Sequence, residues 1–216
     1  PARTTSAPTT SRRTTGQHDS RRFRPNQYDN PNGPLSHYYT TGPEISGGYG
    51  PQGHALRGRH WHRRHHLRHR QVPQGSLQRT VKVIGSDPEG SIYSDPNDVH
   101  QYQIEGVGED FYPKAFDRSL PDEIVQVTDA EAFEMTRRLA NEEGLLVGGS
   151  SGMAVFSALK YAREHDLDEN QLVVVLMPDS GRSYMEKIFN DDWMRANGFA
   201  DVVERTTKPS LAEQYL

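Results

Sequence analysis

Short apolar segments alternate with amphipathic helical segments from residue 81 to residue 196, and this alternation restricts the possible folds more than any other feature. Strands are expected at residues 81–85, 124–127 and 172–177, which are rich in Val, Ile and Leu. Helices are expected at residues 129–143, 151–164 and 184–196. Residues 172–177 are apolar throughout, as in a strand that is covered on both faces. The alternation predicts an α/β layer structure with a mainly parallel sheet.

Two of these helices carry apolar faces, and the first of them also carries clear end signals. Thr128 and Glu131 have the spacing of a capping box, and Gly144 is placed to end the helix that they begin. One face of this helix carries Phe133, Thr136, Leu139 and Ala140. One face of the next helix carries Ala154, Val155, Ala158, Leu159 and Ala162. We expect both faces to point into the core.

The part of the chain before residue 81 has a different composition. Residues 1–80 contain thirteen Arg and only three acidic residues, whereas the remainder has a net negative charge. Residues 1–23 are poor in apolar side chains and are expected to be disordered. Residues 24–46 are turn-rich, with a short helix expected at 41–45. Six His and six Arg fall between His54 and Arg70, without a period of 2 or 3.6.

Cysteine is absent, which excludes disulfides, zinc–thiolate sites and thiol nucleophiles. No apolar run approaches the ~20 residues that cross a bilayer, and none near the N-terminus is typical of a secretion signal. We therefore expect no membrane association and a cytoplasmic location.

The segment Gly148-Gly149-Ser150-Ser151-Gly152 stands where a strand pattern gives way to a helix. A helix N-terminus offers free N–H groups to a ligand, and glycines allow a ligand to approach the backbone closely. A serine cap with glycines for tight packing is the alternative interpretation. Gly106 and Gly108 are compatible with a flexible closing loop or with an ordinary connection.

Two other polar segments are less specific. Residues 178–182 follow the most apolar strand at its carboxyl end, where open α/β sheets bind ligands, but a capped turn explains the same residues. Asp191 and Asp192 are consecutive, so on a helix they point in different directions and do not form an acid/base or metal-binding pair. We expect these two residues on a solvated helix face, and no metal site.

Four stretches, in this order and at these separations, resemble one enzyme family: VKVIGSDPEGSI, YQIEGVGEDFYP, EEGLLVGGSSG and LMPDSGRSYMEKIFNDDWM. They resemble the C-terminal part of the catalytic domain of cystathionine β-synthases, which are pyridoxal-phosphate enzymes of the tryptophan-synthase-β-like fold type II. RPNQYDNPNGPLSHYYTTGPEI is similar to the preceding helix region. The resemblance implies part of a three-layer α/β fold, with residues 81–200 as the C-terminal part of the catalytic domain and 201–216 as a tail or linker.

The resemblance also implies roles for particular residues. Ser150 would hydrogen-bond the pyridine nitrogen of pyridoxal 5′-phosphate, with Gly148 and Gly149 beside the cofactor. A neutral hydroxyl there leaves the ring nitrogen unprotonated, which suits β-elimination and replacement. Gly106 and Gly108 would lie in the loop that closes over the amino acid substrate. The implied reaction joins serine and homocysteine to give cystathionine and water, in a homo-oligomer without a specific nucleic-acid partner.

Residues 47–80 depart from the family pattern. The family carries a Gly/Thr-rich phosphate loop there, and this chain carries the Arg/His-rich block. Codons that can encode residues 60–70, read one base later, can encode Ile-Gly-Thr-Gly-Gly-Thr-Ile-Ser-Gly-Thr-Gly. We therefore interpret residues 47–80 as an out-of-frame translation of the phosphate loop and the helix that follows it.

The lysine that forms the family's Schiff base with the cofactor has no counterpart here. The five lysines are Lys82, Lys114, Lys160, Lys187 and Lys208, and none stands in a Ser-x-Lys context. We expect the chain to be a fragment of a cystathionine β-synthase that is inactive as it stands. A cysteine synthase is the alternative within the family, and a non-catalytic Arg/His-rich nucleic-acid-binding protein is the alternative from another class.

Overall fold

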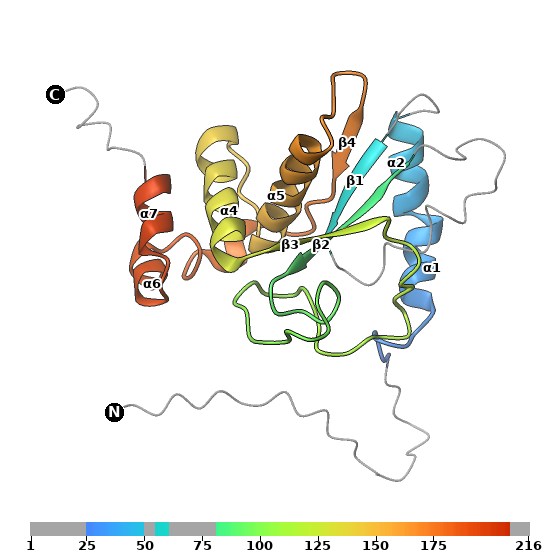
Figure 1. Cartoon of the computed structure of the whole chain (residues 1–216), viewed down its shortest axis with the longest axis horizontal. Coiled ribbons are helices and arrows are strands. Elements are labelled where there is room, and N and C mark those ends of the chain that lie inside the picture. Colours follow the sequence, from blue (N-terminus) through green and yellow to red (C-terminus); the bar gives the residue numbers. More distant parts are fainter. Residues whose placement is uncertain (1–24, 50–54, 61–80, 208–216) are drawn as a thin grey trace, which may run out of the picture.

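The computed structural model describes residues 25–49, 55–60 and 81–207. Four parallel strands form one sheet in the order β3-β2-β1-β4. The strands are β1 (Ala55–His60), β2 (Val83–Pro88), β3 (Glu123–Val127) and β4 (Leu172–Val175). Figure 1 shows α4 (Asp129–Glu143) and α5 (Gly149–Glu164) on one side of this sheet, and α1 (Asn32–Tyr39) and α2 (Thr41–Tyr49) on the other. The predicted α/β layer structure with a parallel sheet is confirmed.

The internal strand β2 is buried at all six positions, including the polar residues Ser86 and Asp87. Strand β2 begins two residues and ends three residues later than predicted. Its contact with the segment leading into β3 starts at Val83, whose amide donates to the Asp122 carboxylate and whose carbonyl accepts from the Asp122 amide. Ser86 Oγ lies 2.6 Å from Ser157 Oγ on α5, so the polar half of the strand is tied to the helix above it.

The prediction that residues 172–177 form a strand covered on both faces is wrong. The strand β4 ends at Val175, and its side chains are half-buried or exposed. Because β4 pairs with β1 alone, it lies at the edge of the described sheet, where fewer neighbours cover it.

Helix α4 has the predicted bounds and the predicted capping box. Glu131 N donates to Thr128 Oγ1 at 3.2 Å, and the Glu131 carboxylate accepts from Thr128 N at 2.8 Å. The helix ends at Gly144, whose φ of 69° is left-handed. Phe133, Thr136 and Leu139 are buried as expected, while Ala140 is half-buried.

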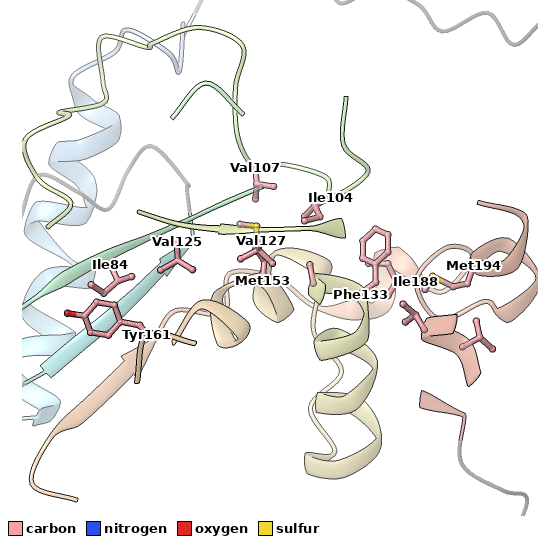
Figure 2. Close-up of a cluster of buried hydrophobic side chains, with 13 residues drawn as sticks. Ile84, Ile104, Val107, Val125, Val127, Phe133, Met153, Tyr161, Ile188 and Met194 are labelled. Carbon is pink, nitrogen blue, oxygen red and sulfur yellow. The ribbon is translucent and has the colours of Figure 1, made fainter. Parts of the chain in front are cut away.

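Helix α5 starts at Gly149, two residues before the predicted start. Ala154 and Ala158 of the predicted apolar face are buried, and Val155 and Ala162 are half-buried. Leu159, expected in the core, is 42% exposed, whereas Met153, Ser157 and Tyr161 are buried. Helix α5 packs against both α4 and the sheet. The residues that face these two neighbours are therefore the ones that are buried. Figure 2 shows Met153 and Tyr161 in the same cluster as Ile84, Val127 and Phe133.

The C-terminal part differs from the expected single helix and tail. Residues 181–184 form a 3₁₀ turn, η1 (Gly181–Tyr184), and α6 (Asp191–Ala196) begins only after Asn190, whose side chain caps it. A further helix, α7 (Ala200–Thr206), packs on α4 with Val202 and Val203 buried, so the core extends into the expected tail.

The sequence prediction also missed a buried arginine, and this corrects the interpretation of Asp191. Arg137 on α4 is 8% exposed and donates to Asp191 Oδ1 at 2.6 Å, to Ile188 O at 3.0 Å and to Thr206 Oγ1 at 2.6 Å. Asp191 is therefore not simply on a solvated face, because it joins α6 to α4.

Before residue 81, the structure adds elements that the pattern did not predict. Helix α1 and most of α2 lie within residues 24–46, which the resemblance had identified as a helix region, although the local pattern indicated turns at α1. Helix α2 is longer than the helix expected at 41–45. Strand β1 falls within the block for which no period was found. The expected disorder of residues 1–23 and most of the Arg/His-rich block lie outside the described residues.

Candidate functional site

Two of the segments singled out in the sequence meet at the N-terminus of α5. Gly148 N donates to Asp179 O at 3.2 Å, and Gly181 N donates to Leu146 O at 3.0 Å. Val147 and Ser180 form an isolated antiparallel bridge between them. The turn after β4 is thus fixed against the turn that leads into α5, at the carboxyl edge where parallel sheets bind ligands.

Gly148 is required by close packing at this junction. A Cβ at residue 148 would collide with the Asp179 carboxylate and would lie 2.7 Å from the Tyr184 ring. Gly148 is also the N-cap residue of α5 and has no side chain to cap it. No side chain caps the first amides of α5, and Ser151 N and Gly152 N donate to the backbone oxygen of Gly148 at 3.0 and 3.3 Å.

The two serines of this turn have different surroundings. Ser150 is 4% exposed, and its Oγ donates to Asp179 Oδ1 at 3.4 Å. Ser151 is fully buried, and its Oγ has no hydrogen-bond partner among the described residues. The structure therefore places both hydroxyls at the helix start, and only Ser150 contacts the turn after β4.

Asp179 and Tyr184 complete this group. The sequence analysis singled out the segment 178–182, which contains Asp179, but it missed Tyr184. Tyr184 OH donates to Asp179 Oδ2 at 2.7 Å. Burial, followed by the hydrogen bond to Asp179 and the charges of Asp179 and Glu105, raises the pKa of Tyr184 above its usual range, so the phenol stays protonated. The position of Asp179 just beyond an apolar strand was the sequence signal that pointed to it.

The loop with Gly106 and Gly108 is held next to this site. Asp129, at the start of α4, accepts hydrogen bonds from Gln103 N at 2.8 Å and Ile104 N at 3.0 Å. The carboxylate of Glu105 forms an ion pair with Lys187, which follows η1. This pair joins the loop to the segment that carries Tyr184.

Within the loop, the backbone at Gly108 requires glycine. Its φ is 63°, and a Cβ there would collide with the Tyr102 hydroxyl and lie 2.8 Å from Pro88 Cγ. Tyr102 OH donates to Val107 O at 2.8 Å, which closes the loop on itself. Gly106 also has a positive φ, of 76°, but a Cβ there would meet nothing within 4 Å. Val107, between the two glycines, belongs to the buried core cluster, as Figure 2 shows. Its side chain therefore anchors the loop to the core.

One further titratable group lies at the same sheet edge. Asp87, near the end of β2, is fully buried, and its Oδ1 has no partner among the described residues. Its Oδ2 accepts from Ser94 N at 2.9 Å. Burial raises the pKa of Asp87 to about 6, against smaller opposing contributions from hydrogen bonds with Ser91 and Ser94.

Within the described ranges, no group of three or more His, Asp or Glu side chains is arranged to hold a metal ion. No described helix is long and apolar enough to cross a membrane.

Comparison with known proteins identifies similar chains. The family profile described as "Pyridoxal-phosphate dependent enzyme" matches residues 66–179. The cystathionine beta-synthase of Dictyostelium discoideum is 45% identical over 137 residues, which are 62% of this chain and 27% of that protein. A cysteine synthase of Helicobacter pylori is 34% identical over 171 residues, covering 76% of this chain and 53% of the relative.

A solved structure has a similar fold. The crystal structure of an O-acetylserine dependent cystathionine beta-synthase from Helicobacter pylori superposes with a TM-score of 0.60 at 31% identity. The match covers 76% of this chain and 52% of that one. The chain thus spans about a quarter of the length of the cystathionine beta-synthase of Dictyostelium discoideum and about half of the solved chain.

Proposed function

Because this chain belongs to the family of pyridoxal-phosphate dependent enzymes, we propose that it carries the ring-binding side of the cofactor site of a β-replacement enzyme. The observation that carries the proposal is the position of the Ser150 hydroxyl. It lies at the start of α5, beside two glycines, at the carboxyl edge of a parallel sheet.

The residues at this edge fit the ring end of the cofactor. A pyridine ring needs one polar partner for its nitrogen and backbone that it can approach closely. Ser150 offers a hydroxyl whose present partner is 3.4 Å away, which is long for an O–H···O bond. Gly148 and Gly149 provide backbone without side chains, and the orphaned Ser151 hydroxyl is a second polar group in the same turn.

When bound, pyridoxal phosphate withdraws electrons from the α-carbon of an amino acid, so that a substituent on the β-carbon can leave and be replaced. Ser150 would position the ring through its nitrogen. The loop with Gly106 and Gly108 would cover the amino acid and exclude water, and the Glu105–Lys187 ion pair would hold that loop to the site.

We propose serine and homocysteine as the substrates, and cystathionine and water as the products. The support is the similarity to cystathionine beta-synthases at 36–46% identity over the matched parts of several of these relatives. Cysteine synthase activity is the alternative, supported by the similarity to the Helicobacter enzyme. The two differ in the nucleophile, which is the thiol of homocysteine in one reaction and sulfide in the other. The cytoplasmic location and the homo-oligomeric state remain proposals from the resemblance.

We further propose that residues 47–80 replace the phosphate loop out of frame, and that the chain is inactive as it stands. The composition of β1 supports this. An internal strand of a parallel sheet is normally apolar, yet β1 has the sequence Ala-Leu-Arg-Gly-Arg-His between β2 and β4. The lysines bear on the proposed inactivity, because none of the five stands in the Ser-x-Lys context of the family's Schiff base. Two of them have carboxylate neighbours instead: Lys187 is paired with Glu105, and Lys82 lies 3.8 Å from Asp122.

A chimaera tests the activity without depending on residues 47–80. Residues 81–207 replace the matching segment of the Dictyostelium enzyme, and the products are separated by chromatography with either homocysteine or sulfide as nucleophile. We expect cystathionine to form, and Ser150→Ala to lower kcat/KM by about tenfold, equivalent to a lost hydrogen bond of about 1.4 kcal/mol. Ser119→Ala, at an exposed turn, is the matched control. Product from sulfide alone would favour the cysteine synthase alternative, and an unchanged Ser150→Ala chimaera would contradict the proposed role of Ser150.

A further inference from the structure

Asp87 is a buried carboxylate whose hydrogen bonds go to the turn that follows its own strand. It stands next to the end of β2 and is fully buried. Its Oδ2 accepts from Ser94 N at 2.9 Å, which is an ordinary length for an amide donor. Hydrogen bonds with Ser91 and Ser94 oppose the rise in its pKa that burial causes, so both contacts favour the carboxylate. Asp87 thus ties residues 91–94 to the sheet.

The turn at residues 91–94 in turn holds the end of the loop of residues 103–109. Ile92 N donates to Glu109 O at 2.9 Å, and Glu109 N donates to Ser91 Oγ at 3.2 Å. Both backbone groups of Glu109 are therefore bound by this turn. Ser91 is fully buried, so water cannot easily take the place of its hydroxyl.

The other anchors of the same loop act before Gly108. Figure 2 shows Ile104 and Val107 in the core cluster, and Ile104 N also donates to the Asp129 carboxylate at 3.0 Å. Gly108 then has a left-handed backbone, with a φ of 63°. Because a glycine in this conformation allows the chain to change direction, the earlier anchors do not by themselves fix Glu109. Its position depends on the turn at residues 91–94.

We propose that Asp87 is a positioning residue for the loop of residues 103–109, because it holds the turn that binds both backbone groups of Glu109. Burial raises the pKa of Asp87 to about 6, so its charge lowers stability at neutral pH. Stability therefore does not explain a carboxylate at this position, whereas holding the turn does. The consequence for catalysis rests on the proposed function, in which this loop covers the amino acid substrate.

Amide hydrogen exchange in the full 216-residue chain, followed by ¹⁵N NMR without cofactor, tests the inference. In Asp87→Ala, we expect the amides of Ile92, Ser94 and Glu109 to exchange about tenfold faster, which corresponds to about 1.4 kcal/mol. Amides inside α4 report global unfolding and should keep their rates. If they accelerate as much as Glu109 does, Asp87 acts through overall stability and the inference is overturned.

Asp87→Asn is the matched variant, because it removes the charge but keeps an oxygen that can accept from Ser94 N. We expect it to restore slow exchange at Glu109, which a role of the charge alone would not predict. Exchange at Glu109 that is unchanged in Asp87→Ala, or as fast in Asp87→Asn as in Asp87→Ala, would overturn the inference.

Ser91→Ala tests whether Asp87 acts through the turn. This variant removes the acceptor of Glu109 N directly, so it should also speed exchange at Glu109. In the Asp87→Ala background it should add little, because the turn is already released. Fully additive effects would show that the two residues act independently and would contradict the proposed route.

The chimaera with residues 81–207 separates the inference from the proposed function. In it, we expect Asp87→Ala to raise the KM for serine about tenfold and to change kcat less, because the loop contacts the bound amino acid rather than the reacting bonds. An unchanged KM in an active chimaera would overturn the consequence for the substrate. An inactive parent chimaera contradicts the proposed function alone, since the exchange experiment contains no cofactor.

Discussion

Replacing Arg137 by Met should strongly destabilise the packing of α4 against the segments that follow α5. The change keeps most of the side-chain volume and removes the three hydrogen bonds that join α4 to residues 188 and 191 and to α7. Arg137 is 8% exposed, so water cannot easily replace the lost donors.

The magnitude follows from what each acceptor loses. The Ile188 carbonyl belongs to a residue that is 3% exposed, and an unsatisfied buried acceptor costs about 1–3 kcal/mol. Asp191 is 38% exposed, so its loss of a charged partner is partly offset by water and costs about 1 kcal/mol. Thr206 keeps its hydrogen bond to Val202 O, so its loss is about 0.5–1 kcal/mol. Together these contributions predict a loss of about 2.5–5 kcal/mol, a large part of a typical margin of about 5–15 kcal/mol.

Urea denaturation followed by circular dichroism measures this loss in the full chain. Arg205→Met is the matched control, because Arg205 pairs with Glu134 between the same two helices but at an exposed position. We expect the control to change the unfolding free energy little. If Arg137→Met is as stable as Arg205→Met, the described network does not hold α7 to α4, and the reasoning from burial is refuted.

Three further predictions concern the cap of α4, Asp87 and residues 47–80. Thr128→Ala should lower the unfolding free energy by about 1 kcal/mol, whereas Thr128→Ser should keep the capping box, and equal losses in urea denaturation would count against the cap. Because burial raises the pKa of Asp87 from 3.8 to about 6, the folded state binds this proton more tightly, so its stabilising contribution is complete below about pH 4 and is lost as the pH rises through about 6. Asp87→Asn should therefore be more stable than the wild type at pH 7, by at most about 3 kcal/mol, and a urea midpoint with unchanged pH dependence would contradict this. Restoring the family reading frame over residues 47–80 should sharpen the thermal transition in calorimetry, because an internal strand of a parallel sheet is stable only when apolar; an equally sharp transition in the original chain would argue against the frame interpretation.

Local sequence signals were enough to predict a helix when the residues that begin and end it stand next to it in the chain. Thr128, Glu131 and Gly144 fixed both ends of α4, because a cap acts within about one helical turn. The family motifs likewise indicated Ser150, and the carboxyl end of an apolar strand indicated residues 178–182, without any knowledge of the packing.

Tertiary structure alone decided the contacts between distant segments. The Ser150–Asp179 contact spans 29 residues and the Arg137–Asp191 contact spans 54, and no period in the sequence encodes either separation. The same holds for burial: Leu159 has the right spacing for the core but lies on the exposed side of α5, because the positions of α4 and the sheet decide which side is covered. Periodicity states that a helix has an apolar side, whereas only the packed neighbours determine which residues on it lose contact with water.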